Sequence, residues 1–435
     1  MIKNLIHLFS KTAKFMLAYS GGLDSTVLFH QLIKLKNEYT SIEFRTIHIN
    51  HNMHPKSDQW SIFCQKICKN YDIDIVIDNI PYLKKNIYGI EADLRNARYT
   101  IIKKHLKQKE ILLTAHHLND QCETFFLALK RGSGPTGLSC MPYKKNIGNN
   151  IHCRPLLMIN KQAILHWAYE NKLNWLSDPN NKNIKFDRNF LREIIIPKIE
   201  KKWPFFIKNL NRSIQLCNNE KKILNEFTIK KFNNCLSSNG SLSINNLNQY
   251  NTTMINLILR HWIKFHKQEV PSYQNTNNIY KKIISINNHD NACIQFQKYE
   301  IRRYRNHLYL IIIQNKINNL ILFWKNHHKP LILPNKIGML RKNKYGNNLP
   351  KPNLKEIINI RFKIESKTKI KINNKTKMIK KLWQNIGIPI WERKKIPLIY
   401  YNNFFITALG YFINQDHNLK KRQTWNISWE NYIKK

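Results

Sequence analysis

Residues 15–26 read FMLAYSGGLDST, and this stretch decides the fold. An apolar run typical of a buried strand enters a Ser-Gly-Gly turn, and an apolar pattern typical of a helix leaves it. Paired glycines adopt backbone angles barred to other residues and carry no side chain, so backbone N–H groups can approach an oxyanion beside the N-terminus of the following helix. The stretch therefore predicts a phosphate site. The alternative is an ordinary strand-turn-helix in which Asp24 and Ser25 only cap the helix.

Two other nucleotide-binding motifs are excluded. No Lys follows the glycines of this turn in the manner of G-x-x-x-x-G-K-[ST], and the glycines of the turn do not have the spacing G-x-G-x-x-G. The turn instead resembles the pyrophosphate-loop (PP-loop) signature of the ATP pyrophosphatase superfamily, whose members cleave ATP between its α and β phosphates. The ATP-binding residues that this resemblance implies are Ser20, Gly21, Gly22, Leu23, Asp24 and Ser25.

Length and composition indicate a globular protein with an anionic partner. The 435 residues, 42% of them hydrophobic, suffice for two or three domains, each with its own core. The formal net charge of +45, from 72 basic and 27 acidic residues, favours a polyanion such as nucleic acid. An AT-rich coding sequence, which enriches Lys, Asn and Ile throughout, is the alternative explanation of this charge.

The cysteines and the apolar runs indicate the cellular compartment in which the protein works. Eight cysteines are scattered along the chain without a Cys-x-x-Cys pair, which argues against a metal cluster and a disulfide framework. The apolar start, residues 1–9, is too short for a signal peptide, and no later run is long enough to span a membrane. We therefore expect a reduced, cytoplasmic protein.

Short apolar runs alternate with amphipathic stretches in the first half of the chain. This βαβα order predicts a doubly wound, mainly parallel sheet that is covered by helices on both faces. Ligands of such sheets bind beyond the carboxyl ends of the strands. The expected strands are 15–19, 44–49, 73–77 and 111–114, and the expected helices are 24–36, 57–71, 91–107 and 120–130.

Polar residues follow the expected strands. After the second strand, residues 48–54 read HINHNMH, which suits contact with a nucleobase or ribose, or else a solvated loop with Ser57 as a helix N-cap. Glu91, Arg95 and Arg98 share one helical face, which could orient phosphates or a carboxylate, or else form solvated ion pairs.

The fourth strand leads into residues 114–124, TAHHLNDQCET. Asp120 and Glu123, at i and i+3 in a first helical turn, can both face the sheet edge where Mg²⁺ on ATP would lie. Acidic residues in a first turn are also ordinary partners of the helix dipole. The adjacent histidines do not suit a zinc site, because adjacent side chains diverge and no third ligand lies nearby in the sequence.

Six separated blocks of the first half resemble the tRNA(Ile)-lysidine synthases in order, spacing and residue type, from the first strand to about Pro197. The blocks are SGGLDS at 20–25, HHLNDQCET at 116–124, RGSGPTGL at 131–138, RPLL at 154–157, WLSDPNN at 175–181 and RNFLR at 188–192. The chain departs from this family's pattern at His54, where an Arg is usual, and at Leu94, where Ala precedes the first Arg of Ala-Arg-x-x-Arg-Tyr. The first departure puts the role of position 54 in doubt.

The second half carries no catalytic cluster. Helices are expected at 205–235, 257–265 and 279–286, a strand at 307–313, a loop at 342–355, alternating residues at 357–364, and strands at 398–401 and 404–411. The expected buried residues of the first of these helices are Leu210, Ile214, Leu216, Ile223, Leu224 and Phe227. Basic residues beside Trp383 and Trp391 suit phosphate contacts and base stacking, while burial of the two rings in a core is the alternative.

The residues from Gly387 to Leu398 resemble the family's C-terminal domain. We therefore expect an α/β PP-loop catalytic domain at 1–204, a mainly helical tRNA-binding domain at 205–320 and a small α+β tRNA-binding domain at 321–435.

The resemblance implies an ATP-dependent ligase. Its reaction joins free L-lysine to C2 of the wobble-position cytidine of the tRNA(Ile) with a CAU anticodon, through an adenylylated cytidine, and releases AMP and diphosphate. The product, lysidine, changes codon specificity from AUG to AUA and amino-acid identity from Met to Ile. ATP and Mg²⁺ are the expected cofactors.

The family match also suggests site residues. The expected catalytic residues are Asp24, Asp120, Arg131, Asp178 and Arg192, with Asp24 and Asp120 as ligands of Mg²⁺. The residues expected to bind lysine or the adenylyl intermediate are His116, Glu123, Gly132, Asp178, Arg188 and Asn189. A tRNA thiolase, for which a paired Cys set is missing, and a catalytically dead tRNA-binding protein are the alternatives. The sequence does not give the oligomeric state, and a homodimer is among the states that it leaves open.

Overall fold

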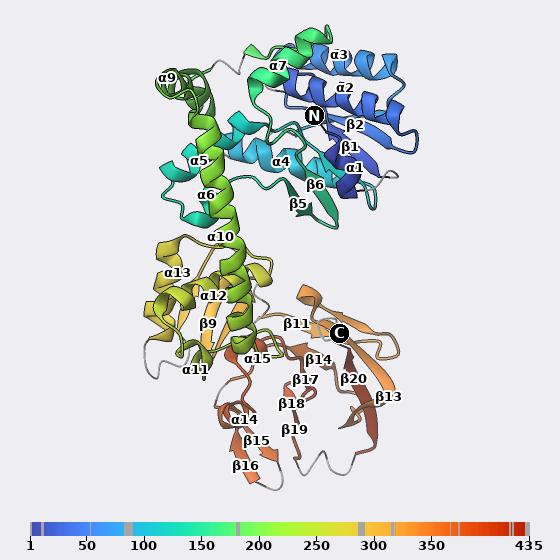
Figure 1. Ribbon diagram of the computed structural model, residues 1–435. Coiled ribbons are helices and arrows are strands. Elements are labelled where there is room, and N and C mark those ends of the chain that lie inside the picture. The colour runs from blue at the N-terminus through green and yellow to red at the C-terminus, as the bar shows by residue number, and fades with distance from the viewer. Residues whose placement is uncertain are drawn as a thin grey trace. The chain divides into compact units, whose positions relative to one another are not determined.

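The computed structural model describes the chain except residues 1, 10–12, 53, 82–89, 180–182, 286–291, 315–316, 318, 366, 373–374, 417–418, 420–421 and 431–435. The chain divides into two compact units, Met1–Phe227 and Thr228–Lys435, and Figure 1 shows the elements of each. The finer division into domains at 204 and 320 stays a prediction. None of the described helices is both long and apolar enough to cross a membrane.

A six-stranded sheet organises the first unit, in the order β3-β2-β1-β4-β6-β5. All neighbouring strands are parallel except β5 and β6, which form an antiparallel hairpin at one edge. The predicted doubly wound, mainly parallel sheet is therefore confirmed. The strands are β1 Lys14–Ala18, β2 Glu43–Asn50, β3 Ile75–Asn79, β4 Ile111–Leu113, β5 Lys144–Ile147 and β6 Asn150–Cys153.

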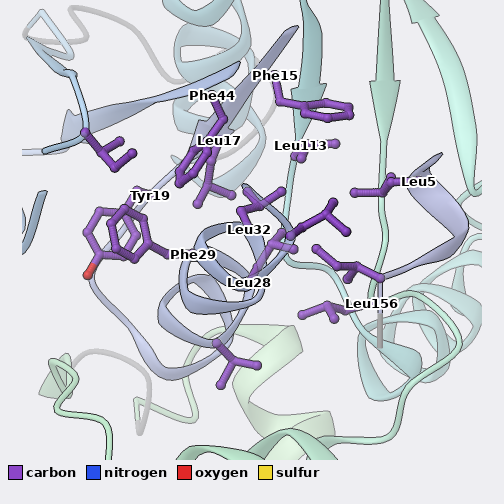
Figure 2. Packing of buried hydrophobic residues seen from close by; sticks show 14 of the residues in the cluster. Leu5, Phe15, Leu17, Tyr19, Leu28, Phe29, Leu32, Phe44, Leu113 and Leu156 are labelled. Carbon is purple, nitrogen blue, oxygen red and sulfur yellow. The ribbon is translucent and has the colours of Figure 1, made fainter. Parts of the chain in front are cut away.

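Helices cover both faces of this sheet, because alternate side chains of each buried strand point to opposite faces. In β1, Phe15 and Leu17 join a core formed with α1, α2, α3 and α7 (Figure 2). Met16 packs on the other face with Ile102 of α4. The helices are α1 Asn4–Phe9, α2 Leu23–Glu38, α3 Ser57–Asn70, α4 Ile90–His105, α5 Leu118–Lys130, α6 Pro135–Leu138, α7 Lys161–Glu170, α8 Asp187–Phe190, the π-helical turn η2 Leu191–Ile195, α9 Ile196–Lys202 and α10 Phe206–Cys235.

The second unit begins inside α10 and contains a helical region around a small antiparallel sheet, in the order β7-β10-β9-β8. Trp262 is fully buried in its core, and the indole N–H donates a hydrogen bond to the carbonyl of Gly240 at 2.9 Å. The elements are β7 Leu242–Ser243, α11 Ile244–Leu247, α12 Thr252–Phe265, α13 Tyr273–Ile279, the π-turn η3 Tyr280–Ile284, β8 Cys293–Gln295, β9 Tyr299–Tyr304 and β10 His307–Ile312.

The end of the chain is rich in strands, which confirms the expected α+β region. Trp383 and Trp391 are 4% and 9% exposed, so burial in the core, rather than base stacking, describes both rings. The elements are β11 Ile321–Phe323, β12 Leu331–Leu333, the 3-10 turn η4 Pro334–Lys336, β13 Gly338–Pro350, β14 Ile358–Arg361, β15 Lys369–Ile372, β16 Lys375–Met378, α14 Ile379–Ile386, α15 Ile390–Arg393, β17 Leu398–Tyr401, β18 Phe404–Ala408, β19 Phe412–Ile413 and β20 Thr424–Glu430.

The prediction of a loop at 342–355 is wrong for the first part of that range. Residues up to Pro350 belong to β13, which pairs with β20 and shifts register between Lys342 and Asn347. An irregularity of this kind adds residues to one strand only, so the alternation that marks a strand in the sequence is interrupted.

The burial expected along α10 is confirmed for only two residues. Leu210 and Ile214 are buried against α5, whereas Leu216, Ile223, Leu224 and Phe227 are exposed. The apolar residues of this long helix cover more of its circumference than the stripe that α5 contacts.

Candidate functional site

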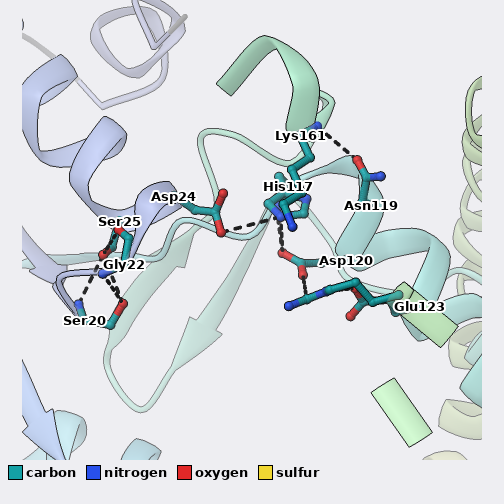
Figure 3. A network of polar contacts seen from close by, with 10 residues as sticks. Ser20, Gly22, Asp24, Ser25, His117, Asn119, Asp120, Glu123 and Lys161 are labelled. Carbon is teal, nitrogen blue, oxygen red and sulfur yellow. Dashed lines mark hydrogen bonds and ion pairs between the residues drawn. The ribbon is translucent and has the colours of Figure 1, made fainter. Parts of the chain in front are cut away.

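The turn after β1 is held by hydrogen bonds of its own serines. Ser25 Oγ donates to the carbonyl of Gly22 at 3.0 Å and lies 3.0 Å from Ser20 Oγ, which in turn accepts from the N–H of Gly22 at 3.4 Å (Figure 3). Gly22 is the N-cap of α2, and no side chain caps the helix. The N–H groups of the first turn therefore have no side-chain acceptor, which suits a phosphate.

Gly21 is required by two features of its surroundings. Its φ of +76° lies in the left-handed region, and an added Cβ would lie 2.8 Å from Leu176 Cδ1 and 2.9 Å from Cys64 Sγ. The carbonyl of Gly21 accepts from the N–H of Leu176 at 2.9 Å, and Gly22 and Leu176 form a parallel bridge. The chain around residue 176 is thereby fixed to the turn, with Asp178 two residues further on.

His117 lies between two carboxylates that come from different strand ends. It is the N-cap of α5, and its Nε2 atom lies 3.6 Å from Asp24 Oδ2 and 3.7 Å from Asp120 Oδ2 (Figure 3). The N–H of His117 also donates to Asp120 Oδ2 at 2.9 Å. The two predicted carboxylates, Asp24 and Asp120, are therefore brought to one edge of the sheet.

Arg192 joins the acidic residues of α5 to the π-turn η2. Its Nε donates to Glu123 Oε1 at 2.6 Å, and its Nη2 donates to Asp120 Oδ1 at 3.2 Å. A second ion pair, Lys130 to Asp187 at 2.8 Å, fixes α8 at the other end of α5. Single π-turns often occur at functional sites, where they redirect side chains.

Burial sets the charges of these carboxyl groups. It raises the pKa of Asp24, with the interaction with His117 opposing and the negative charge of Asp120 adding to the effect. Burial acts the same way on Asp120, but His117, His116 and the hydrogen bond from the His117 N–H hold its pKa below the usual value. Burial raises the pKa of Glu123, against the attraction of Arg192.

Asp24 is the carboxylate that best fits a metal ion. Its Oδ1 atom is buried and has no hydrogen-bond partner among the described residues, whereas both oxygens of Asp120 accept hydrogen bonds. The described residues contain no group of three or more metal-ligating side chains. Mg²⁺ that travels with a nucleotide needs only one or two carboxylates beside the phosphates, so Asp24 fits this ion.

The other predicted site residues lie around this network. His116 forms a hydrogen bond with Thr114 Oγ1 at 2.7 Å, and burial lowers its pKa to about 3. The charge of Asp178 acts to raise the pKa of His51, and the charge of Arg188 acts to lower the pKa of Glu123. Asp178 therefore lies near His51, and Arg188 lies near Glu123. Asn189 donates to the carbonyl of Asn183 at 2.9 Å.

Arg131 and Gly132 lie apart from the network. They follow the last residue of α5, about 17 Å along the helix from Asp120, and both are exposed. The structure therefore does not bring them to Asp24, and their roles stay predictions.

Sequence reasoning missed His117 and Lys161. Lys161 begins α7, its N–H donates to Asn119 Oδ1 at 3.0 Å, and its charge lowers the pKa of Asp24. The sequence signal for His117 was its position directly before a helix whose third residue is Asp120, because these two positions form a capping box.

His54, where the chain departs from the family pattern, stacks on Trp60 with ring centres 5.1 Å apart. The side chain of Glu91 is outside the described part of the structure.

Three family models match the chain. Residues 1–199 match the PP-loop domain, residues 242–309 the TilS substrate binding domain, and residues 358–429 the TilS substrate C-terminal domain.

Similar proteins cover the whole chain. A tRNA(Ile)-lysidine synthase of Buchnera aphidicola subsp. Schizaphis graminum (strain Sg) is 45% identical over 100% of this chain and 98% of its own length. The tRNA(Ile)-lysidine synthase of Serratia proteamaculans (strain 568) is 35% identical over 95% of each chain. Among solved structures, the U34-tRNA thiolase NcsA from Methanococcus maripaludis with its [4Fe-4S] cluster aligns at a TM-score of 0.41 and 17% identity, over 49% of this chain and 75% of that one.

Proposed function

Because the chain belongs to the tRNA(Ile)-lysidine synthase family, we propose that the network around His117 carries out the ATP-dependent ligation of free L-lysine to C2 of the wobble cytidine of the tRNA(Ile) with a CAU anticodon. The relatives' name denotes an enzyme that joins lysine to tRNA(Ile), and this chain is an enzyme of that kind. The observation that carries the site assignment is the meeting of Asp24, His117, Asp120 and Arg192 beside the PP-loop.

The PP-loop is the site proposed for ATP. Ser20, Gly21, Gly22, Leu23 and Ser25 surround the uncapped start of α2, where N–H donors can stabilise the charge that develops on departing diphosphate. Asp24 would hold Mg²⁺ through Oδ1, which has no hydrogen-bond partner among the described residues, and Asp120 lies on the other side of His117. Bound there, Mg²⁺ would neutralise charge on the phosphates.

The chemistry requires that cytosine O2 become a leaving group. O2 attacks the α-phosphorus of ATP and diphosphate departs; the ε-amine of lysine then attacks C2, loses a proton, and AMP departs. Arg192, fixed by two carboxylates, is suited to hold the adenylyl group, because a guanidinium with a set orientation binds phosphate oxygens without reorganisation.

Free lysine is assigned to the side of the site that carries Asp178. Asp178 binds the α-ammonium group and Arg188 the carboxylate, with His116, Glu123 and Asn189 as further contacts. The position of Asp178 supports this assignment. The N–H of Leu176 donates a hydrogen bond to the carbonyl of Gly21, and Asp178, two residues further on, therefore lies at the rim of the PP-loop.

The tRNA contacts extend beyond the catalytic unit. The matches to the substrate binding and substrate C-terminal models support contacts of residues 205–435 with tRNA. An enzyme that acts on tRNA is expected in the cytoplasm, and a homodimer stays a prediction.

The test is transfer of radiolabelled lysine to tRNA transcripts with ATP and Mg²⁺. We expect label on tRNA(Ile) with a CAU anticodon and none on tRNA(Met). Asp24→Asn should abolish transfer, whereas Asp72→Asn, at an exposed turn, should retain it. Tight tRNA binding without transfer by the unmodified chain would contradict the proposal and favour the catalytically dead alternative, and incorporation of sulfur would favour a thiolase.

A further inference from the structure

Two large aromatic side chains are exposed where α9 ends and α10 begins. Trp203 is 56% exposed and Phe205 is 71% exposed, although rings of this size are usually buried. They line a hollow of about 420 Å³ together with Lys202, Pro204, Phe206 and Asn209. This volume lies within the range of small-ligand pockets.

Trp203 packs on aromatic side chains that connect it to a neighbouring helix. Trp203 stacks on Phe206 with ring centres 6.3 Å apart, and Phe206 stacks on Phe126 of the helix α5 at 6.1 Å. The following turn of α10 is also anchored, since Ile207 and Leu210 are buried against the same helix. The aromatic surface is therefore attached to the helix that carries Asp120 and Glu123.

The charge around the rings favours an anion. Between residues 196 and 212 the chain has five basic side chains, all exposed, and one acidic side chain. Lys202 lies over the ring of Trp203 at 5.8 Å. Basic side chains interleaved with exposed aromatic rings are the arrangement that binds unpaired nucleotides, through phosphate contacts and base stacking.

The distance from the reacting centre matches an anticodon loop. Eleven residues of a continuous helical run separate Arg192 from Trp203, which is about 17 Å along the axis. A stacked nucleic-acid strand advances about 3.4 Å per nucleotide, and a splayed one advances further, so this distance corresponds to a few nucleotides. A wobble cytidine held at Arg192 places its neighbours in the loop within reach of the rings.

We propose that Trp203 and Phe205 form a stacking site for an unpaired anticodon-loop base of the tRNA, a few nucleotides from the wobble cytidine. The site rests on the proposed function and adds to it a contact that positions the anticodon loop outside the reacting centre. A second copy of the chain is the competing occupant of this surface.

Photo-crosslinking with the full chain tests the contact. 4-Thiouridine is placed singly at each anticodon-loop position except the wobble base, and adducts are mapped on the protein after irradiation. At one position or more, we expect an adduct within residues 202–209 that Phe205→Ala removes. Absence of adducts in this segment from every position would overturn the proposal.

Affinity for tRNA gives the second test. Phe205→Ala should raise the Kd for tRNA roughly 5- to 150-fold, the range for loss of one base-aromatic stack, with the KM values for ATP and lysine unchanged. Phe205→Tyr keeps a ring and should bind as the unmodified chain does. The matched control is Phe227→Ala on the same helix, where the ring is 59% exposed, and it should leave the Kd unchanged.

A double-mutant cycle identifies the partner base. Replacing the crosslinked nucleotide by an abasic one should weaken binding to the unmodified chain and have no further effect on Phe205→Ala. Independent effects of the two changes would overturn the proposal, as would an unchanged Kd with loss of self-association in Phe205→Ala. Failure of the unmodified chain to transfer lysine would instead contradict the proposed function.

Discussion

At the scale of single residues, the PP-loop depends on an absent side chain. Gly21 adopts a left-handed conformation, and it also lies against Leu176 and Cys64, which come from distant parts of the chain. The same glycine therefore shapes the turn and lets the chain before Asp178 approach it.

Comparing Gly21→Ala with Gly148→Ala separates the cost of backbone strain from the cost of the clash with neighbouring side chains. Gly148 also has a positive φ, of +62°, but an added Cβ there meets nothing within 4 Å. We expect Gly148→Ala to lower the free energy of unfolding by about 1 kcal/mol, the cost of left-handed backbone strain, with the KM for ATP unchanged. Gly21→Ala should lower it further and raise the KM for ATP more than about tenfold, because the loop must shift. Equal kinetics for the two variants would contradict this role of Gly21.

Asp178→Asn tests the lysine site. The change removes the negative charge proposed to face the α-ammonium group, and a charge-assisted hydrogen bond contributes about 1.5–3 kcal/mol. We expect the KM for lysine to rise roughly 10- to 100-fold and the KM for ATP to change little. Steady-state kinetics with Asp72→Asn as control measure this, and an unchanged KM for lysine would refute the assignment.

Glu110 gives a prediction about pH. It is 4% exposed and accepts from Arg45 Nε at 2.7 Å and Arg45 Nη2 at 2.8 Å. Burial opposes its charge, but the hydrogen bonds from Arg45 and from the N–H of Lys107 hold its pKa below the usual 4.5. A lowered carboxyl pKa contributes stability above pH 4.5, and this contribution is lost as the pH falls through the folded-state value.

Glu110→Gln should accordingly lower the free energy of unfolding by about 2–3 kcal/mol at pH 7, and this difference should shrink below pH 4.5. Denaturant unfolding across this pH range measures it. In the exposed pair Lys14 to Glu43, the change Glu43→Gln should cost less than about 1 kcal/mol. A difference for Glu110→Gln that grows with acidity would show that the sign is wrong.

At the scale of elements, the site is assembled by helices that follow different strands. The helix α5 presents Asp120 and Glu123, and the π-turn η2 presents Arg192 to both. The same helical run continues into α9 and leads to the exposed rings at 203 and 205. The elements that hold the reacting groups thus also position the proposed stacking surface.

The pairing of β13 with β20 gives a prediction at this scale. An added Cβ at Gly346 would lie 2.2 Å from the carbonyl carbon of Ile427, and backbone cannot move aside as a side chain can. Gly346→Ala should lower the stability of the second unit by about 1–3 kcal/mol and expose β20 to hydrogen exchange. Gly410→Ala, in the same unit with nothing within 4 Å, should leave β20 protected. Unchanged exchange in Gly346→Ala would contradict the pairing.

At the scale of the whole molecule, the net charge of +45 has two explanations, RNA binding and coding bias. They predict different salt dependence. Each phosphate that a protein neutralises releases counterions, whereas scattered lysines that contact nothing release none.

We therefore expect the Kd for tRNA to rise at least about 100-fold between 50 and 200 mM salt, which corresponds to roughly four neutralised phosphates. The KM for lysine, measured at saturating tRNA, is the internal control and should change little. Filter binding over this range measures the slope. A slope close to zero would favour coding bias as the source of the charge.

Much of this architecture was determined by the sequence alone. The Ser-Gly-Gly turn, the alternating strands and helices, and the i, i+3 spacing of Asp120 and Glu123 are local patterns, and local patterns follow from backbone geometry and periodicity. They were enough to predict the parallel sheet, the phosphate site at the turn and the carboxylates at the sheet edge. They failed at β13, where an irregularity in register hides the period, and on α10, where apolar residues outnumber the buried positions.

Only the tertiary structure decided which side chains meet. Arg192 and Glu123 are 69 residues apart, and His117, rather than His116, lies between Asp24 and Asp120. Periodicity tells which face of an element a side chain occupies, but not which distant element packs against that face. Packing selects the partners, because a buried charge is stable only where the fold supplies its counter-charge and hydrogen bonds.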